Sequence, residues 1–161
     1  MTTKEYNNCV KIHADGVFRF VLKNLVNRSD AQDVVQNTFE KLWRKHETVN
    51  YEKSKSYLFS IAHNDMIDLI RKNKFVKAYE NVPERAGGEF TKQMEAKEIM
   101  EKGLKSLSPI QKSLILLKDY EGYSYEEMAE MTELSLSQVK VYLFRARKKM
   151  QVAVNQLNKA V

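Results

Sequence analysis

The sequence is poor in the residues that interrupt helices. Its 161 residues include only 5 glycines and 2 prolines, the residues that most often end helices or form turns. Apolar residues instead recur every three or four positions along most of the chain, and no long segment alternates between apolar and polar residues. This pattern predicts an all-α fold, because such spacing places apolar side chains on one side of a helix.

Cysteine and long apolar runs are also scarce. Cys9 is the only cysteine, which excludes an intramolecular disulfide. No run approaches the roughly 18 consecutive apolar residues that a membrane-spanning helix needs. The first residues lack the apolar segment of a signal peptide. We therefore expect a soluble cytoplasmic protein with no stable membrane insertion.

The chain lacks a convincing cluster for catalysis or metal binding. Cys9 and His13 are four residues apart and could share one helix face, but a structural zinc site needs four ligands. His46 and His63 do not have the spacing of a second ligand pair. Because no acid–base or metal cluster stands out, we expect no enzymatic activity, no metal and no cofactor.

What the chain does contain is excess positive charge, part of it near the C-terminus. The formal net charge is +6, which favours polyanionic partners. Residues 136–151 are rich in lysine and arginine and contain no acidic residue, whereas residues 125–134 are acidic and apolar. An acidic helix, a short turn and a basic helix are typical of a helix-turn-helix whose second helix enters the major groove of DNA.

The spacing within this basic helix separates inward from outward positions. Val139 and Leu143 are four apart and are expected to face a small core. Outward arginine can pair with guanine, glutamine with adenine, and an apolar side chain can touch a thymine methyl. Lys148 and Lys149 are expected to contact phosphates. The predicted DNA-binding residues are Gln138, Lys140, Val141, Tyr142, Phe144, Arg145, Lys148 and Lys149. The competing interpretation is an ordinary solvated amphipathic helix.

The apolar pattern divides the chain into two helical halves. Ser29 or Asp30 is expected to cap the second helix, while Ser108 and Ser124 are expected to cap two later ones. Residues 77–97 contain a proline and a Gly-Gly pair and are predicted to be a flexible linker. The expected domains are residues 1–76 and 98–161. Predicted helices cover residues 6–26, 30–46, 56–74, 94–106, 109–121, 124–132 and 136–151.

Motifs in both halves resemble bacterial sigma factors. DAQDVVQNTFEKLWR, at residues 30–44, looks like the region 2 signature, and SYLFSIAHNDMIDLIRKNK, from Ser56, is similar to the promoter −10 helix that follows it. Residues 107–150, LSPIQKSLILLKDYEGYSYEEMAEMTELSLSQVKVYLFRARKKM, resemble region 4. There is no room between them for region 3. The chain therefore resembles the extracytoplasmic-function (ECF) group, the smallest sigma-70-type factors.

This resemblance implies a role in transcription initiation. The protein would bind core RNA polymerase, through the β′ clamp coiled coil and the β flap, direct it to promoters and assist DNA opening. An anti-sigma factor is a further implied partner. The residues implied in polymerase binding are Asp33, Gln36, Asn37, Glu40 and Arg44. Asn37 departs from the acid that the family usually has there, and Trp43 and Phe39 are expected to lie in the core.

The resemblance also implies a −10 reader at residues 48–55 and in the helix that follows. Family members flip a base of the non-template strand into a pocket formed by this loop, which suits polar groups beside an aromatic ring. Tyr57 could instead belong to the core, and Asn64 matches the family motif IA-x-N. The implied residues are Tyr51, Lys53, Lys55, Tyr57, Asn64, Arg71 and Lys72, whose cations would neutralise phosphates.

The preferred −35 sequence and one alternative function stay open. Phe144 and Arg145 match the family pattern, but Val141 and Tyr142 do not, so the preferred −35 sequence is expected to differ from the usual one. The alternative function is a stand-alone helix-turn-helix regulator whose first half dimerises or senses a signal. Residues 30–44 favour a sigma factor, because such a regulator does not need them.

Overall fold

The computed structural model describes residues 1–80 and 96–159. Within these two ranges every regular element is helical and no strand occurs, which confirms the predicted all-α class. The predicted linker at 77–97 falls mainly at residues 81–95, outside the described residues. The elements are α1 (Thr3–Leu25), α2 (Arg28–Lys45), the 3-10 helix η1 (Tyr51–Lys53), α3 (Ser54–Glu80), α4 (Ala96–Lys105), α5 (Pro109–Ile115), the π-helical turn η2 (Leu116–Tyr120), α6 (Tyr125–Thr132) and α7 (Leu136–Lys159).

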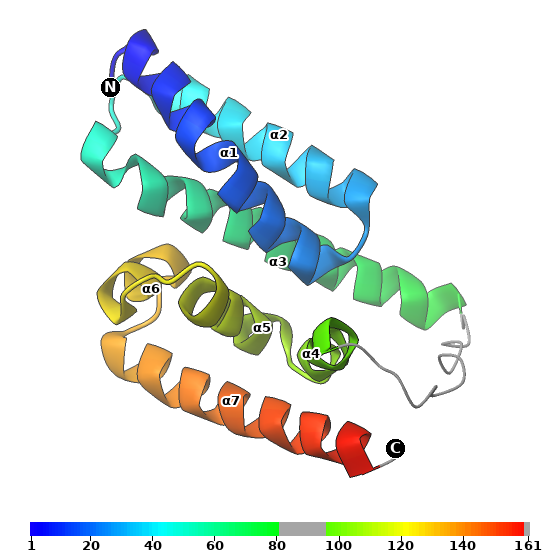
Figure 1. The fold of residues 1–161 in the computed structure, drawn as a ribbon. Helices are drawn as coiled ribbons and strands as arrows, with labels where there is room; N and C mark the ends of the chain where they lie inside the picture. The colour runs from blue at the N-terminus through cyan, green and yellow to red at the C-terminus, as the bar shows by residue number, and fades with distance from the viewer. Residues whose placement is uncertain (81–95, 160–161) are drawn as a thin grey trace.

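The first half of the chain is a bundle of α1, α2 and α3 (Figure 1). Its core is built from the apolar faces of all three helices and includes Val17, Leu42 and Leu58, all buried. The side chain of Asn27 caps α2 by accepting a hydrogen bond from the backbone N–H of Asp30 at 3.0 Å. The predicted cap at Ser29 or Asp30 is therefore wrong, because both residues already lie in the first turn.

Two helices of the second half begin at the serine caps that the sequence predicts. Ser108 and Ser124 each cap a helix through a reciprocal capping box, with Gln111 and Glu127 respectively. The last helix, α7, extends to Lys159 rather than ending near Gln151. Its extra turns pack closely on α4, where a Cβ added to Gly103 would lie 3.1 Å from a methyl carbon of Val154.

A wide π-helical turn joins α5 to the helix-turn-helix. The backbone N–H of Glu121 donates to the carbonyl of Leu116 at 3.0 Å, five residues back. The predicted helix from Pro109 to Gly122 is therefore not a single α-helix. Gly122 has φ of +76°, a left-handed conformation that glycine adopts without a steric penalty. Such wide turns contain an extra residue relative to an α-helix.

The two halves pack against each other and share one continuous set of buried side chains. Figure 1 shows α5 and α6 lying beneath α1 and α3, with α7 on the far side of the second half. The ring of Tyr123 is buried against Phe59 of α3, with centroids 5.1 Å apart. The domain boundaries at 76 and 98 stay a prediction. Over the described ranges, no helix is both long and apolar enough to cross a membrane.

Candidate nucleic-acid interface

The recognition helix α7 begins at a tight, well-capped turn. Glu133 ends α6 in the left-handed conformation with φ of 59°. The Ser135 hydroxyl then accepts from the N–H of Gln138 at 3.1 Å, and the Ser135 N–H donates to the side-chain carbonyl of Gln138 at 2.9 Å. The side-chain carbonyl of Gln138 is therefore used in capping, and its amide NH₂ can donate to a base.

The outward face of α7 presents most of the residues predicted to bind DNA. Val141 is 44% exposed and Phe144 is 64% exposed. Tyr142 is the exception: it is half-buried against the core, because it follows Val139 by three residues and shares its inward face. The other exposed members of the predicted set are Gln138, Lys140, Arg145, Lys148 and Lys149.

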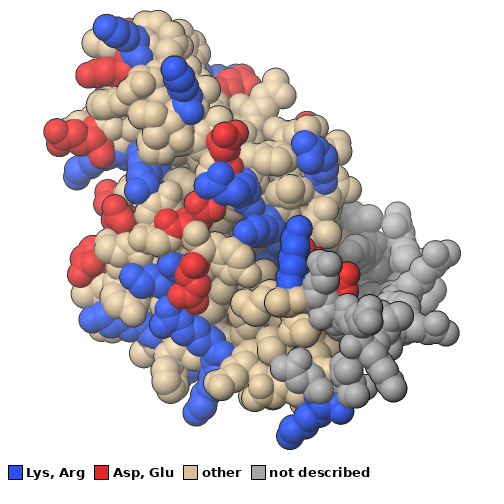
Figure 2. All heavy atoms as spheres, viewed as in Figure 1, with Lys and Arg blue, Asp and Glu red and all other residues tan. Residues whose placement is uncertain are grey.

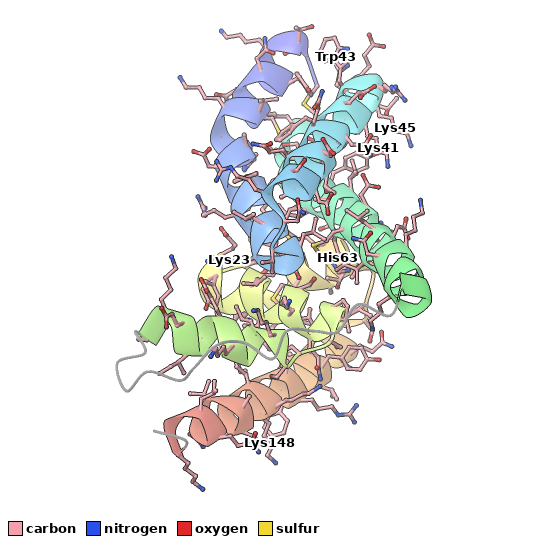
Figure 3. The ribbon with its side chains drawn as sticks, turned by 90° about the vertical axis from the view of Figure 1, so that its right-hand side faces the viewer. Lys23, Lys41, Trp43, Lys45, His63 and Lys148 are labelled. Carbon is pink, nitrogen blue, oxygen red and sulfur yellow. The ribbon has the colours of Figure 1, made fainter. Side chains whose placement is uncertain are left out.

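Basic side chains collect over α7 on the surface of the molecule. Figure 2 shows lysine and arginine along the lower edge of this face, and Figure 3 shows Lys148 pointing away from the first half. Arg147 differs from its neighbours because it binds Asp119, with an N–O distance of 2.6 Å. Arg147 therefore ties α7 to η2, whereas the ammonium of Lys148 lies 5.5 Å from the ring centroid of Phe144.

The loop before α3 and the start of α3 form the second candidate surface. Asn50 caps η1 by accepting from the N–H of Glu52 at 3.0 Å, and Ser54 Oγ donates to the carbonyl of Tyr51 at 2.6 Å. Asn8 of α1 donates to the phenol oxygen of Tyr51. The loop is therefore held in shape by its own polar side chains and by α1, and the predicted residue Tyr51 is anchored there.

A groove of about 450 Å³ runs along this loop, and only some of the predicted −10 residues line it. Lys53 and Tyr57 line the groove, together with Lys45. Tyr57 is half-buried, so its ring faces both the core and the groove. The ammonium of Lys55 instead lies 4.2 Å from the ring centroid of Tyr123, which turns it toward the second half of the chain.

The remaining predicted −10 residues lie farther along α3. Asn64 and Arg71 are exposed and lie outside the groove. Lys72 lines a different groove, between α2 and α3, where Asp33 and Asp65 are among its neighbours. The structure therefore places Lys72 beside a residue predicted to bind polymerase rather than beside the groove.

The exposed face of α2 carries the residues predicted to bind polymerase. Asn37 donates to Asp65 Oδ2 at 3.0 Å, and Glu40 pairs with Arg44 at 2.5 Å, one helical turn away. The members of this set, all exposed, are Asp33, Gln36, Asn37, Glu40 and Arg44. Their exposure leaves them accessible to another protein, and their role in polymerase binding stays a prediction.

Trp43 and Phe39 were both expected in the core, and only Phe39 is buried. Trp43 is 42% exposed. Its ring stacks on His46, 4.2 Å away, and meets the edge of the Tyr6 ring at 4.9 Å. The prediction for Trp43 is wrong because this residue lies near the end of α2, where its ring packs on the side chains of His46 and Tyr6 instead of entering the core.

The titratable side chains of His63 and Cys9 are buried, apart from the two candidate surfaces. His63 of α3 is buried, its Nδ1 has no hydrogen-bond partner, and burial lowers its pKa to about 4. Figure 3 places His63 where α3 meets the second half. Cys9 is buried as expected, and burial raises its pKa. Among the residues that the structure describes, no three His, Cys, Asp or Glu side chains are grouped to hold a metal.

The contacts that join the halves were missed at the sequence level. They comprise an ion pair between Arg19 and Glu121 at 3.2 Å and the packing of Tyr123. No local pattern could have found them, since each contact joins residues that are far apart in sequence. The side chains between η2 and α6 that meet the first half, Glu121 and Tyr123, are therefore known only from the structure.

Comparison with known proteins matches both halves of the chain to one family. The model of Sigma-70 region 2 matches residues 9–76, and that of Sigma-70, region 4 matches residues 97–150. The chain is 28% identical over 149 residues to RNA polymerase sigma factor SigV of Bacillus subtilis, covering 92% of this chain and 90% of SigV.

A second relative and a solved structure agree with these matches. The ECF RNA polymerase sigma factor SigM of Bacillus subtilis is 26% identical over 153 residues, covering 91% of this chain and 93% of SigM. The fold is similar to that of sigma factor RpoE from Bartonella quintana, solved in complex with the anti-sigma factor NepR. That match has a TM-score of 0.78 and 24% identity, over 95% of this chain and 98% of RpoE. The chain belongs to the ECF group of sigma-70-type RNA polymerase sigma factors.

Proposed function

We propose that this sigma factor binds bacterial core RNA polymerase, directs it to promoters through −10 and −35 elements, and assists promoter opening in the cytoplasm. The observation that carries the proposal is the presence, on one chain, of an exposed acidic-polar face on α2, a polar groove beside α3 and an exposed basic helix α7. Sigma factors are not generally enzymes, and we assign no catalytic residue.

The face of α2 is the proposed polymerase-binding surface. Its acids and amides are solvent-exposed, and Glu40 and Arg44 pair along the helix. Surface pairs of this kind are weak, so these side chains can exchange partners when another protein docks. The neighbouring groove adds the carboxylate of Asp68, whereas that of Asp65 already pairs with Lys41 at 2.6 Å. The exposed acids Asp33 and Glu40 favour a basic partner surface. Trp43, which is partly exposed at the end of α2, supplies an aromatic anchor of the kind enriched at interfaces.

The groove beside α3 is the proposed −10 reader. An extruded base needs a stacking surface and hydrogen-bonding groups around its edge. Tyr57 offers the ring, Asn50 and Ser56 offer polar atoms, and Lys53 offers a cation to the backbone phosphate. Asn64 and Arg71, exposed farther along α3, would follow the strand beyond the groove.

The exposed face of α7 is the proposed −35 reader. Arg145 is exposed and can form a paired contact with a guanine edge. Val141 and Phe144 provide apolar surface for thymine methyl groups. Lys148 and Lys149, beyond them, would contact phosphates.

An anti-sigma factor is the proposed regulatory partner. Support comes from the similar fold of RpoE, which was solved bound to one. A groove of about 560 Å³ lies between the end of α1 and α4, lined by apolar residues such as Leu22 and Met100. Lys23, Lys97, Lys105 and Lys112 also line it, and Glu101 is the single acid among the described lining residues. This chemistry fits an acidic amphipathic helix.

Run-off transcription with purified core polymerase on fragmented genomic DNA tests the proposal. We expect the chain to produce transcripts with defined 5′ ends, preceded by shared sequences near −10 and −35. A stand-alone regulator would instead bind DNA by itself and would not direct core polymerase to start transcripts. Tight binding to duplex DNA without polymerase, together with no added transcripts, would contradict the sigma-factor function.

Replacing Arg145 with alanine should change which promoters are used. A lost bidentate base contact costs about 1–3 kcal/mol at one position of the site, equivalent to about 5- to 150-fold in binding. We therefore expect −35 preference to relax at a single position, as read by sequencing the run-off products. Lys149→Ala is the matched control, expected to weaken all promoters alike. An equal loss on all sequences for Arg145→Ala would make it a phosphate contact.

Replacing Asn64 with alanine should impair −10 recognition or DNA opening while polymerase binding is retained. The side chain is exposed on α3 and is not used in the core, so the protein should remain folded. Permanganate reactivity of unpaired thymines at a promoter measures opening, and co-elution with core polymerase measures binding. Loss of co-elution would show that Asn64 belongs to the polymerase interface.

A further inference from the structure

A further groove lies between the N-terminal turns of α1 and η1, and the proposed function does not use it. Its volume is about 510 Å³, and we call it the α1 groove. Tyr51 belongs to the predicted −10 set but lines this groove rather than the groove beside α3. The described residues that line the α1 groove are Lys4, Glu5, Asn7, Asn8, Lys11 and Tyr51.

The α1 groove combines cations, amides and an aromatic ring. Lys4 and Lys11 are exposed and lie seven residues apart on one side of α1, which is about 10 Å along the helix axis. The carboxylate of Glu5 is engaged in the helix cap, where it accepts from the backbone N–H of Thr2 at 2.7 Å. Proteins that bind single-stranded nucleic acid combine cations along the backbone with rings on which bases stack. The lining of the α1 groove matches that chemistry.

The ring of Tyr51 is fixed at the wall of the groove. Its phenol oxygen accepts a hydrogen bond from the amide of Asn8, and the half-buried ring packs in part against the core. Asn7 is exposed, and its amide has both donors and an acceptor. An unpaired base needs a stacking surface and hydrogen-bond partners along its edge. Tyr51 and Asn7 supply these two requirements from neighbouring elements.

The place of the α1 groove along the first half of the chain indicates which nucleotides would reach it. α1 contacts η1, from which α3 begins, and the other end of α3 leads to the residues that join the two halves (Figure 1). Because the second half is the proposed reader of the upstream −35 element, the end of α3 near Arg71 faces upstream and η1 faces downstream. Asn50 lines the groove beside α3, and the next residue, Tyr51, lines the α1 groove. A strand leaving the −10 groove downstream therefore meets the α1 groove.

We propose that the α1 groove binds unpaired nucleotides of the non-template strand between the −10 element and the transcription start. This inference rests on the proposed function, because it assumes that the groove beside α3 holds the −10 element. Tyr51 stacks on a base, Asn7 contacts the edge of that base, and Lys4 and Lys11 neutralise phosphates. Every described residue that lines the groove belongs to the first half of the chain.

Such a site assists promoter opening by binding only one state of the DNA. In a duplex the bases are paired and stacked on each other, so a ring at the protein surface can stack on them only after the strands separate. A ligand site that binds one of two states shifts the equilibrium toward that state. The α1 groove therefore favours the melted promoter over the closed one.

Forked promoter fragments with two lengths of single-stranded tail test the inference with the holoenzyme. In one fragment the non-template strand ends directly after the −10 element, and in the other it continues to the transcription start. The ratio of the two affinities isolates the downstream nucleotides. Lys4→Ala/Lys11→Ala should lower this ratio. The log–log salt dependence of the long-tail affinity should become shallower by about 1.4, because a single strand contributes about 0.7 for each phosphate contact.

Arg28→Ala is the matched control for the lysine variant. It removes an exposed cation that lies at the start of α2, outside the α1 groove, and it should leave the affinity ratio unchanged. An unchanged ratio in Lys4→Ala/Lys11→Ala would overturn the inference. Loss of co-elution of that variant with core polymerase would also overturn it, because the groove would then contact protein rather than DNA.

Replacing Tyr51 separates stacking from charge. Tyr51→Leu should lower the affinity ratio by about 5- to 150-fold, the usual effect of removing one aromatic ring from a stacked base. Tyr51→Phe keeps the ring and should keep the ratio. An equal loss of affinity on both tails in Tyr51→Leu would contradict stacking in the α1 groove, because the ring would then act on the −10 element or on the shape of the loop.

A photoreactive thymine at single positions of the non-template strand locates the contact directly. In open complexes, a probe just downstream of the −10 element should crosslink to residues 4–11 or to Tyr51, and a probe within the −10 element should crosslink beside α3. If the downstream probe reaches only core polymerase while the −10 probe still reaches α3, the inference fails alone. Absence of both crosslinks would contradict the proposed function, and the inference with it.

Discussion

Replacing Phe59 with alanine is expected to lower the free energy of unfolding by about 3–5 kcal/mol, the usual cost of removing a buried aromatic ring. Phe59 is 1% exposed. Its ring packs against Phe20 of α1, with centroids 5.6 Å apart, and against Tyr123 of region 4. Urea unfolding followed by circular dichroism measures the change. The cavity would lie where both halves meet, so both should be weakened together.

Phe144→Ala is the matched control for this loss. The same side chain is removed, but Phe144 is 64% exposed on α7, so the expected change is within about 0.5 kcal/mol. A loss of under about 1 kcal/mol for Phe59→Ala would show that its ring is not packed between the halves. An unfolding curve with two steps, of which only the first shifts, would show that Phe59 stabilises region 2 alone.

The second large effect is a loss of stability in mild acid caused by His63. Its pKa is about 4 in the folded chain and about 6.5 when unfolded, so below pH 6.5 the unfolded chain binds the proton more tightly. Stability from the neutral imidazole is full above pH 6.5, falls as the pH drops and levels off below pH 4. Between pH 7.5 and 5.0 the expected loss is about 2 kcal/mol.

His63→Leu isolates this contribution, because leucine fills similar space and does not titrate. Urea unfolding of both proteins at the two pH values should show the additional loss only in wild type. The ring protons of His63, followed by NMR, should not titrate until well below pH 6. Equal pH dependence of the two proteins would contradict a buried, neutral His63.

Features governed by neighbouring residues could be predicted from the sequence. Ser108 and Ser124 cap helices through partners three residues away, and the helix-turn-helix follows from the order of acidic and basic segments. The outward positions of α7 also follow from helical periodicity. Tyr142 is the exception, because the apolar stripe of α7 is wide enough to include it.

Features governed by distant residues could not be predicted. The exposure of Trp43 depends on which helix covers the end of α2, and sequence spacing gives only its side of the helix. The position of Lys55 over Tyr123 joins segments that are far apart in the sequence. In both cases local sequence determines where a side chain points, whereas tertiary packing determines what it meets.

The contacts between the two halves depend on the number of residues in the π-helical turn at Leu116–Tyr120. Successive residues of an α-helix are rotated by about 100°, and the wide turn holds one residue more than an α-helical turn would. Deleting a residue here would rotate Glu121 and Tyr123 away from Arg19 and Phe59 while leaving each helical bundle its own core. A change in length at this turn would therefore uncouple the halves.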